Sequence, residues 1–293
     1  MIGELLPLRA EFFWPFISYV FTSATNRLGT IQLNIDRMAY ASVLLLITIG
    51  IFGLNTEVSF LQIFYLTISG IIGLILGDSF LFKAFQEIGP RLTILVYSSN
   101  PAFAAILAFL VFGETLNIWG ILGIVITLFG ISLVIMEKNN GRSQHSANFK
   151  GLFLAFLGAI GQAGGLIFAK LAFNEGDIHS LVATLVRIGS AVLIMLPIAL
   201  IFKRYKNPFK LYYQDRKSFQ LVSIGSVIGP YLGISLSFIA ITNTNIGIAS
   251  TLLSTVPIVM LPLNYYIYKE KLSYKSIIGA FIAVGGVSIL FLI

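Results

Sequence analysis

Residues 98–135 read SSNPAFAAILAFLVFGETLNIWGILGIVITLFGISLVI, and residues 253–292 read LSTVPIVMLPLNYYIYKEKLSYKSIIGAFIAVGGVSILFL. The second stretch repeats the first at an offset of 156 residues, because Pro101 aligns with Pro257 at that spacing. The other identical pairs are Glu114 with Glu270, Gly123 with Gly279, Gly130 with Gly286 and Ser132 with Ser288. An internal repeat built from apolar segments is typical of secondary transporters, and it predicts a binding site where the two copies meet.

The composition predicts a membrane protein. Hydrophobic residues make up 57% of the 293 residues and charged residues only 11%, with a mean hydropathy of +0.92. Soluble domains carry about 25% charged residues, so a water-soluble fold has no means of hiding this much apolar surface. The apolar runs reach about 20 residues, the length at which a helix crosses about 30 Å of hydrocarbon. We therefore expect the lipid bilayer to surround most of the chain.

The residue inventory excludes several classes of function. The chain has no cysteine, which excludes disulfides, thiol catalysis and thiolate metal sites. The two histidines, His145 and His179, fall far apart in expected loops. Without a phosphate-cradling GxxxxGK[ST] motif or clustered carboxylates, we expect neither an enzyme nor an ATP-driven pump, and no metal or other cofactor. The net charge of +7 is interpreted as contact with anionic lipid and as an orientation signal, with no nucleic acid as a partner.

Ten apolar segments follow one another along the chain. The predicted spans are residues 4–25, 31–53, 60–84, 91–113, 116–136, 150–173, 179–202, 217–241, 246–268 and 274–293. They form two units of five, residues 1–140 and residues 148–293. Because five is odd, the second unit enters the membrane from the opposite side. The predicted fold is an all-α polytopic membrane protein with ten transmembrane helices in two inverted five-helix repeats.

Basic residues in the connecting segments predict the orientation. We call face A the membrane face that the chain reaches after each odd-numbered span, and face B the other. Nearly all basic residues of the connections fall on face A, whereas face B has at most Arg9 and Lys170. The positive-inside rule makes face A cytoplasmic, which puts both termini outside a cytoplasmic membrane that the chain crosses many times.

Three ionisable residues lie at membrane depth, where charges are costly and mark functional sites. Asp78, the only acid that we place well inside a span, and Arg37 are expected at matching depth in consecutive antiparallel helices and are predicted to pair. The pair has either a structural role or a role in gating or proton coupling. Arg187 has no such partner, because Ile234 occupies the position that matches Asp78. Its guanidinium suits a carboxylate or phosphate on a solute, unless it extends to face B or binds backbone carbonyls.

Two prolines within the fourth and ninth predicted spans, Pro101 and Pro257, are expected to interrupt their helices. Interrupted helices at corresponding positions of two halves are the best sequence indication of a transporter site. Candidate residues for lining a solute pathway nearby are Tyr97, Ser98, Asn100, Ser254 and Thr255, with Tyr231 as a weaker candidate. The alternative is that these hydroxyl and amide groups only satisfy neighbouring helices.

Small residues and matched acids have expected structural roles. Gly73 and Gly77 in the third span align with Gly229 and Gly233 in the eighth, and each pair has the small-xxx-small spacing that lets helices approach closely. Glu114 and Glu270 each precede a short turn. We interpret them as structural acids that bind helix-terminal N–H groups or a basic neighbour.

The chain resembles the EamA-type transporters of the drug/metabolite transporter superfamily. The similar pieces are LGTIQLNIDR (28–37), GDSFLFKAFQEIGPR (77–91), NPAFAAILAFLVFGETL (100–116), LGISLSFIAITNTNIGIASTLLSTVPI (232–258), KEKLS (269–273) and IGAFIAVGGVSIL (278–290). The resemblance implies two inverted five-helix units around a central cavity, with the fifth and tenth helices at the periphery. It also implies cytoplasmic termini, opposite to the charge rule, and a Trp-Gly pair where this chain has Trp14-Pro15.

The expected function is secondary transport of a small organic solute by alternating access. The resemblance implies export or exchange of amino acids, related metabolites or drug-like compounds, and protons are a candidate coupling ion. The alternatives are a nucleotide-sugar or phosphorylated-sugar exchanger of the same superfamily, or a non-transporting membrane module such as a lipid scramblase or scaffold. The solute, the direction of transport and the oligomeric state, monomer or homodimer, stay open.

Overall fold

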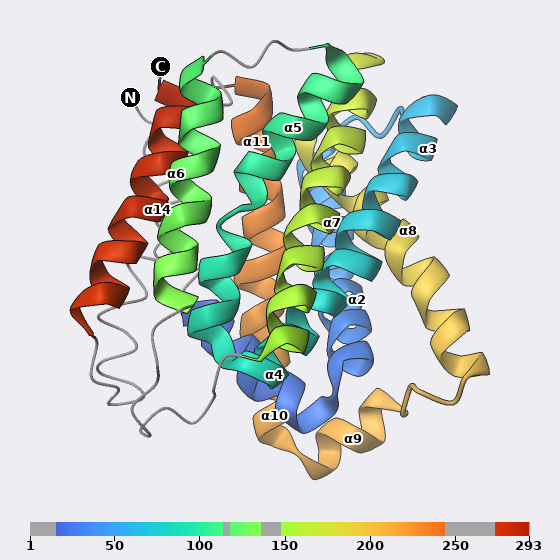
Figure 1. The fold of residues 1–293 in the computed structure, drawn as a ribbon. Coiled ribbons are helices and arrows are strands. Elements are labelled where there is room, and N and C mark those ends of the chain that lie inside the picture. The colour runs from blue at the N-terminus through green and yellow to red at the C-terminus, as the bar shows by residue number, and fades with distance from the viewer. Residues whose placement is uncertain (1–15, 114–117, 136–147, 244–272, 293) are drawn as a thin grey trace.

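A computed structural model describes residues 16–113, 118–135, 148–243 and 273–292. Within these ranges the chain forms helices joined by short loops, with no strand, and the helices form one bundle (Figure 1). Residues 16–28 are helical and lead through Gly29 into α2. The elements that follow are α2 (Thr30–Phe52), α3 (Phe60–Ser69), η1 (Gly70–Gly77), α4 (Asp78–Tyr97), α5 (Asn100–Phe112), α6 (Ile118–Ile135), α7 (Phe149–Asn174), α8 (Ser180–Ile201), α9 (Pro208–Gln214), α10 (Arg216–Ser226), η2 (Val227–Gly233), α11 (Ile234–Asn243) and α14 (Tyr274–Leu292).

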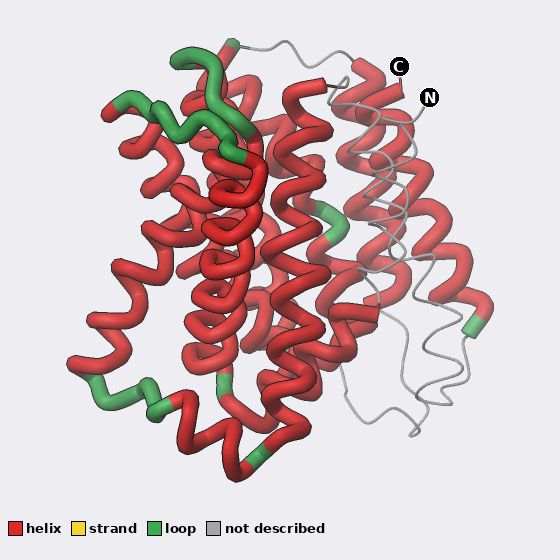
Figure 2. The backbone as a smooth tube through the Cα atoms, turned by 180° about the vertical axis from the view of Figure 1, so that it is seen from behind, coloured by secondary structure: helices red, strands yellow, loops and turns green. Residues whose placement is uncertain are grey.

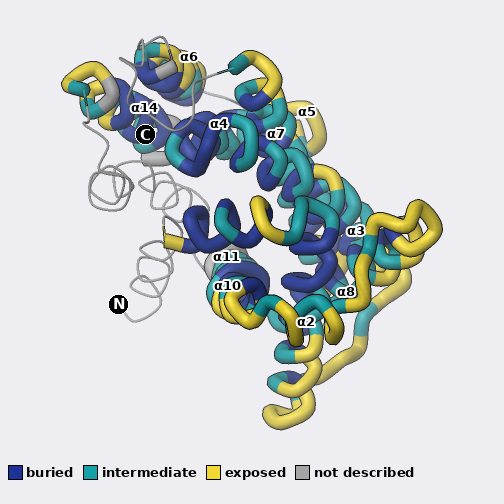
Figure 3. The backbone as a smooth tube through the Cα atoms, turned by 90° about the horizontal axis from the view of Figure 1, so that it is seen from below, coloured by how far each residue is buried: buried dark blue, intermediate teal, exposed yellow. Residues whose placement is uncertain are grey.

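The lengths and surfaces of these helices fit a lipid environment. Five helical runs in the described part are long and apolar enough to cross a membrane, and three shorter apolar helices accompany them. The outer faces of α2 and α8 expose large apolar side chains such as Leu46 and Leu193, whereas polar residues such as Asn34 and Thr184 are buried. Figure 3 shows the same arrangement, with exposed positions on the outer side of α2, α3 and α8 and buried positions toward the middle of the bundle.

The helix ends follow the predicted spans closely, with one correction. Between the third and fourth predicted spans two helices meet at Gly89, whose φ of 74° is a left-handed conformation suited to glycine, directly before Pro90. This break lies within the predicted connection, between residues 84 and 91. The short helix α9, in the connection between α8 and α10, was not predicted. The predicted span 246–268 lies outside the described residues, as does most of the first span.

Two π-helical segments lie at corresponding positions in the chain. η1 ends at Gly77 and η2 ends at Gly233, the offset at which the sequence repeats. The N–H of Asp78 donates to the carbonyl of Gly73, and the N–H of Ile234 donates to that of Gly229, both across five residues. π-Helical turns are rare and often occur at functional sites, because the wide turn frees carbonyls and shifts side chains.

The glycines of η1 permit a very close approach to α7. A Cβ atom on Gly165 would lie 2.9 Å from Cα of Gly73, and one on Gly161 would lie 2.8 Å from Cα of Gly77. Ser69 Oγ donates to the carbonyl of Gly165 at 2.6 Å, which adds a polar contact to this interface. The glycines of the second half contact a different partner, since a Cβ on Gly229 would lie 3.0 Å from the ring of Phe21.

α6 and α14 pack mainly against each other at one edge of the bundle (Figure 1). Their contacts are reciprocal, because a Cβ on Gly130 would lie 2.6 Å from the carbonyl oxygen of Gly279, and one on Gly286 would lie 2.7 Å from that of Gly123. At the centre Thr127 Oγ1 donates to the carbonyl of Ala283 at 3.3 Å, across a separation of 156 residues. This pattern requires α6 and α14 to run antiparallel.

The α6–α14 interface yields a matched pair of substitutions. Gly286→Ala places a methyl group against backbone atoms of α6, whereas at the neighbouring Gly285 an added Cβ meets nothing within 4 Å. We expect Gly286→Ala to destabilise the protein by about 1–3 kcal/mol through overpacking. Gly285→Ala is the control and should be nearly neutral. Thermal unfolding in detergent measures both, and equal unfolding midpoints for the two variants would contradict the close packing.

Contacts between connecting segments group them by predicted membrane face. On face A, Arg27 Nη2 pairs with Asp215 Oδ1 at 3.0 Å and Lys150 Nζ pairs with Glu87 Oε1 at 2.8 Å. On face B, Gln62 Nε2 donates to the carbonyl of Gly176 at 3.0 Å. Figure 2 shows the α2–α3 and α7–α8 loops at one end of the bundle and the α8–α9 connection at the other.

Candidate functional site

Arg37 and Asp78 form a buried ion pair, as their predicted depths require. Arg37 lies on α2 and Asp78 begins α4 directly after η1, and each residue is 5% exposed. Asn34, one turn before Arg37, accepts from Arg37 Nε at 3.1 Å and from Nη2 at 2.9 Å. The guanidinium also lies 4.7 Å from the ring centre of Phe82, a cation–π contact. A guanidinium this well engaged holds its carboxylate partner in one orientation.

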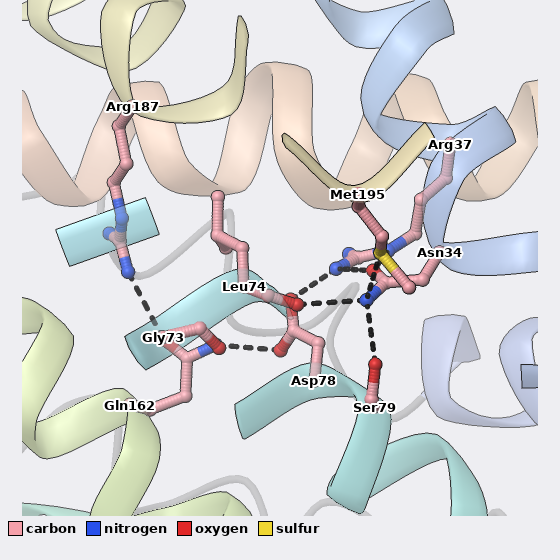
Figure 4. A network of polar contacts seen from close by, with 9 residues as sticks. All are labelled: Asn34, Arg37, Gly73, Leu74, Asp78, Ser79, Gln162, Arg187 and Met195. Atoms are coloured by element: carbon pink, nitrogen blue, oxygen red, sulfur yellow. Dashed lines mark hydrogen bonds and ion pairs between the residues drawn. The ribbon is translucent and has the colours of Figure 1, made fainter. Parts of the chain in front are cut away.

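Two side chains that the sequence analysis missed complete this arrangement, Asn34 and Gln162 (Figure 4). Asn34 Nδ2 donates to the carbonyl of Leu74 within η1 at 2.8 Å. From α7, Gln162 Nε2 donates to Asp78 Oδ1 at 2.6 Å and to the carbonyl of Gly73 at 3.0 Å. The π-helical segment therefore supplies backbone acceptors to both amides. The sequence feature that could have indicated Gln162 is a single glutamine within the glycine-rich run GQAGG.

Arg187 joins the same network from α8 through Gln162. Arg187 Nη2 donates to Gln162 Oε1 at 3.4 Å, and the guanidinium lies 5.5 Å from the ring centre of Phe238. The residue is 2% exposed, so it does not extend to face B. Glycine makes room for it, because a Cβ on Gly73 would lie 2.5 Å from Nη2 and one on Gly165 would lie 3.0 Å away.

Arg187 is only partly satisfied. Its Nε has no hydrogen-bond partner among the residues that the structure describes, although the atom is buried. An unpaired buried donor of this kind is costly, so it requires a specific physical explanation. We call Arg37, Asp78, Gln162 and Arg187 the charge network. Its three charged groups sum to one net positive charge, so it is electrostatically suited to one anionic group.

Tyr97 lies beside the charge network at the end of α4. It is half-buried, it packs against the cluster that contains Phe21 and Phe82, and its phenol interacts electrostatically with Asp78, Arg37 and Arg187. Of the residues predicted around the first proline, Tyr97 is thus the one that the structure brings to Arg37, Asp78 and Arg187.

The other residues near Pro101 form local contacts. α4 ends at Tyr97 and α5 begins at Asn100, so the chain leaves the helix at Ser98 and Ser99 just before Pro101 in the first turn of α5. Ser98 Oγ donates to the carbonyl of Leu95 at 2.6 Å. Asn100 Nδ2 donates to the carbonyl of Ala159 on α7 at 3.0 Å. Ser98 therefore bonds within its own helix, whereas Asn100 bonds the neighbouring helix α7.

The remaining predicted residues lie away from the charge network or outside the described part. The hydroxyl of Tyr231 on η2 shares a hydrogen bond of 2.8 Å with Thr48 Oγ1 on α2. Gly233 ends η2, and the carbonyl of Gly229 accepts from the N–H of Ile234. The residues outside the described ranges are Glu114, Ser254, Thr255, Pro257 and Glu270. Among the described residues, no group of three His, Cys, Asp or Glu side chains has the geometry to hold a metal ion.

A second buried acid corrects the expectation that Asp78 alone is well inside the protein. Asp36 on α2 is 7% exposed. Its carboxylate accepts from Gln32 Nε2 at 2.9 Å, from the Tyr205 hydroxyl at 2.6 Å and from the Tyr212 hydroxyl. The sequence places Asp36 too near the start of its span to appear deep, but the connection between α8 and α10 covers it.

Comparisons with known proteins agree with this architecture. The sequence model of the EamA-like transporter family matches residues 1–136 and again residues 149–292. A solved crystal structure of a protein is similar to this chain with a TM-score of 0.70 and 17% sequence identity, and the match covers 100% of this chain and 96% of that one. At this identity the likeness concerns the fold alone. A search of the curated proteins finds no match.

Proposed function

The chain belongs to the EamA-like transporter family, and from this premise we propose that it is a secondary transporter of a small organic solute. The solute is an amino acid, a related metabolite or a drug-like compound, and it crosses the cytoplasmic membrane by alternating access. The observation that carries the proposal is the charge network, which is buried in a bundle of apolar helices. Charged side chains at such depth in a membrane protein typically mark solute or ion pathways and sites of proton coupling.

The charge network joins the two proposed units, residues 1–140 and residues 148–293. Asp78 comes from the first unit and Gln162 from the second, and their hydrogen bond of 2.6 Å crosses between them. The matched positions of η1 and η2 support a duplicated unit, and the antiparallel, reciprocal contacts of α6 and α14 support its inversion. If one unit rocks against the other, the hydrogen bond between Gln162 and Asp78 must break or shift. The charge network would in this way be coupled to the alternating opening of the solute site toward the two membrane faces.

Arg187 is the proposed contact for the solute. Its Nε, which has no partner among the described residues, and the net positive charge of the network favour a solute that carries a carboxylate, as an amino acid does. Guanidinium binds carboxylate through a planar fork of N–H donors, which an ammonium group does not reproduce. Tyr97 lies close enough to the same charges to line the path of the solute.

A transport assay with matched solutes tests this proposal. Purified protein in proteoliposomes is given amino acids and their primary amides, and saturable uptake is measured for wild type, Arg187→Gln and Arg187→Lys. We expect wild type to prefer the carboxylates, Arg187→Gln to lose about 10–100-fold in their uptake and Arg187→Lys to recover only part of it. The control is Arg204→Gln, which removes an exposed arginine. Saturable uptake that is unchanged in Arg187→Gln would remove Arg187 from the pathway, and the lack of any saturable uptake would contradict the transport function.

A further inference from the structure

Asp36 is a buried carboxylate whose partners are all neutral. Gln32, Tyr205 and Tyr212 supply its hydrogen bonds, and no ion pair in the described part of the chain includes it. Asp78 stands in contrast, because the guanidinium of Arg37 pairs with its carboxylate. A carboxylate that is buried without a cation is the one that gains most from accepting a proton.

The same contacts fasten the connection between α8 and α10 onto α2. We call residues 203–215 the strap. Tyr205 and Tyr212 belong to it, and both donate to Asp36. Gln32 adds a two-sided contact, because its Oε1 accepts from the N–H of Lys206 at 2.8 Å and its Nε2 donates to the carbonyl of Lys206 at 3.3 Å. The strap, with α9, crosses the end of the bundle that forms face A (Figure 1).

We propose that Asp36 is a proton-binding site and that its ionisation state controls the strap. When Asp36 is ionised, the two phenols bind a carboxylate and the strap stays on α2. When Asp36 takes up one proton from water on face A, the carboxylate becomes a neutral carboxylic acid, the phenols lose their charged acceptor and the strap is held less tightly on α2. The step transfers only this proton, so it needs no other reactant.

The surroundings of Asp36 single out its carboxyl as the group that titrates. Burial and the nearby carboxylate raise the pKa of both Tyr205 and Tyr212, so the phenols keep their protons through neutral pH and remain donors. The charged groups on the elements packed against α2 are engaged elsewhere or exposed. Asp78 on α4 pairs with Arg37, Arg187 on α8 binds Gln162, and Arg216 and Lys217 are exposed at the start of α10. None of them contacts Asp36.

Proton binding at Asp36 also costs the fold less than proton binding at Asp78. A proton on Asp78 would leave the guanidinium of Arg37 buried without a counter-charge, which is strongly unfavourable. A proton on Asp36 removes a buried charge that has no counter-ion in the part of the chain that the structure describes. Hydrogen bonds to an ionised acceptor are roughly twice as strong as neutral ones, so protonation weakens both phenol contacts together. The two phenol contacts of the strap therefore respond to a single proton, whereas the contacts of Gln32 with Lys206 and of Arg27 with Asp215 do not.

Two measurements on the purified full-length protein test the proposal without any solute. Infrared difference spectra between about pH 8 and about pH 5.5 detect newly protonated buried carboxyl groups, because exposed carboxylates stay ionised at both values. Hydrogen–deuterium exchange, corrected for intrinsic rates, reports the opening of strap amides at the same two pH values. The variants are Asp36→Asn, the double variant Tyr205→Phe/Tyr212→Phe and, as a matched control, Asp177→Asn at an exposed loop position.

We expect wild type to show a carboxylic-acid signal at low pH. Its strap amides should exchange about tenfold faster at low pH than at high pH, because the loss of one hydrogen bond changes the opening equilibrium by about that factor. Asp36→Asn should lose the signal and show fast exchange at both values, and Asp177→Asn should behave as wild type. The double variant should lose the difference signal and show the carboxylic-acid band in its absolute spectrum at both pH values, because the donors that stabilise the carboxylate are gone. An unchanged signal in Asp36→Asn places the proton elsewhere and overturns the proposal. If hydrogen–deuterium exchange of the strap changes with neither pH nor substitution, Asp36 does not control the strap. If Asp36→Asn does not fold, the double variant decides alone.

Discussion

Replacing Asp78 with asparagine is expected to lower the free energy of unfolding by about 3–5 kcal/mol, the cost of leaving a buried charge without its partner. The variant keeps the shape of the side chain but leaves two buried guanidinium groups, Arg37 and Arg187, with no carboxylate between them. The hydrogen bond from Gln162 to Asp78 Oδ1 becomes a bond to a neutral amide. Transport should be lost as well, because the charge network no longer links the two units.

A double-mutant cycle separates the pair from its surroundings. Arg37→Gln alone should also destabilise strongly, because Asp78 then keeps its charge with only amide donors. In the double variant Asp78→Asn/Arg37→Gln two neutral amides face each other. We expect its loss of unfolding free energy to be about 1–3 kcal/mol smaller than the sum of the losses in the two single variants. Unfolding in detergent by heat and by denaturant measures all four proteins. Effects that simply add would show that Arg37 and Asp78 do not stabilise each other.

Hydropathy and spacing predicted the helices and the depth of the ion pair. The segments around α2, α7 and α8 are apolar over a membrane thickness, so their ends agree with the predicted spans to within a few residues. Arg37 and Asp78 were predicted to pair because consecutive helices are antiparallel, which fixes relative depth. The family was recognisable from the same pieces, and the match of the family to both parts of the chain confirms it.

The contacts that complete the charge network could not be predicted in this way. Depth along a helix says nothing about rotation around its axis, so the direction of Gln162 toward Asp78, across 84 residues of sequence, was not apparent. The π-helical turns were not apparent either, because the glycine spacing that predicts close helix packing does not distinguish a π-helical turn from an α-helical one. Asp36 was overlooked because its phenol donors come from 169 and 176 residues away, in a connection that reads as a polar loop.

A close backbone approach next to the charge network predicts a second large effect. Gly161 on α7 faces η1, and a Cβ there would lie 2.8 Å from Cα of Gly77 and 3.0 Å from the carbonyl oxygen of Ile72. Both neighbours are backbone atoms, which cannot rotate aside as a side chain does. We expect Gly161→Leu to destabilise the protein by more than about 3 kcal/mol, above the usual range for overpacking, because it forces two helices apart.

This separation also bears on the site, because the next residue is Gln162. When α7 moves away from η1, the hydrogen bonds of Gln162 to Asp78 and to the carbonyl of Gly73 lengthen together. Arg187 then loses its one described acceptor, so Gly161→Leu should abolish transport even in the fraction that remains folded. The matched control is Gly189→Leu on α8, where an added Cβ meets nothing within 4 Å. Monodispersity, thermal midpoint and uptake in proteoliposomes are compared for the two variants. A Gly161→Leu protein as stable and active as Gly189→Leu would mean that η1 and α7 do not pack at backbone contact, and the position of Gln162 in the charge network would then be wrong.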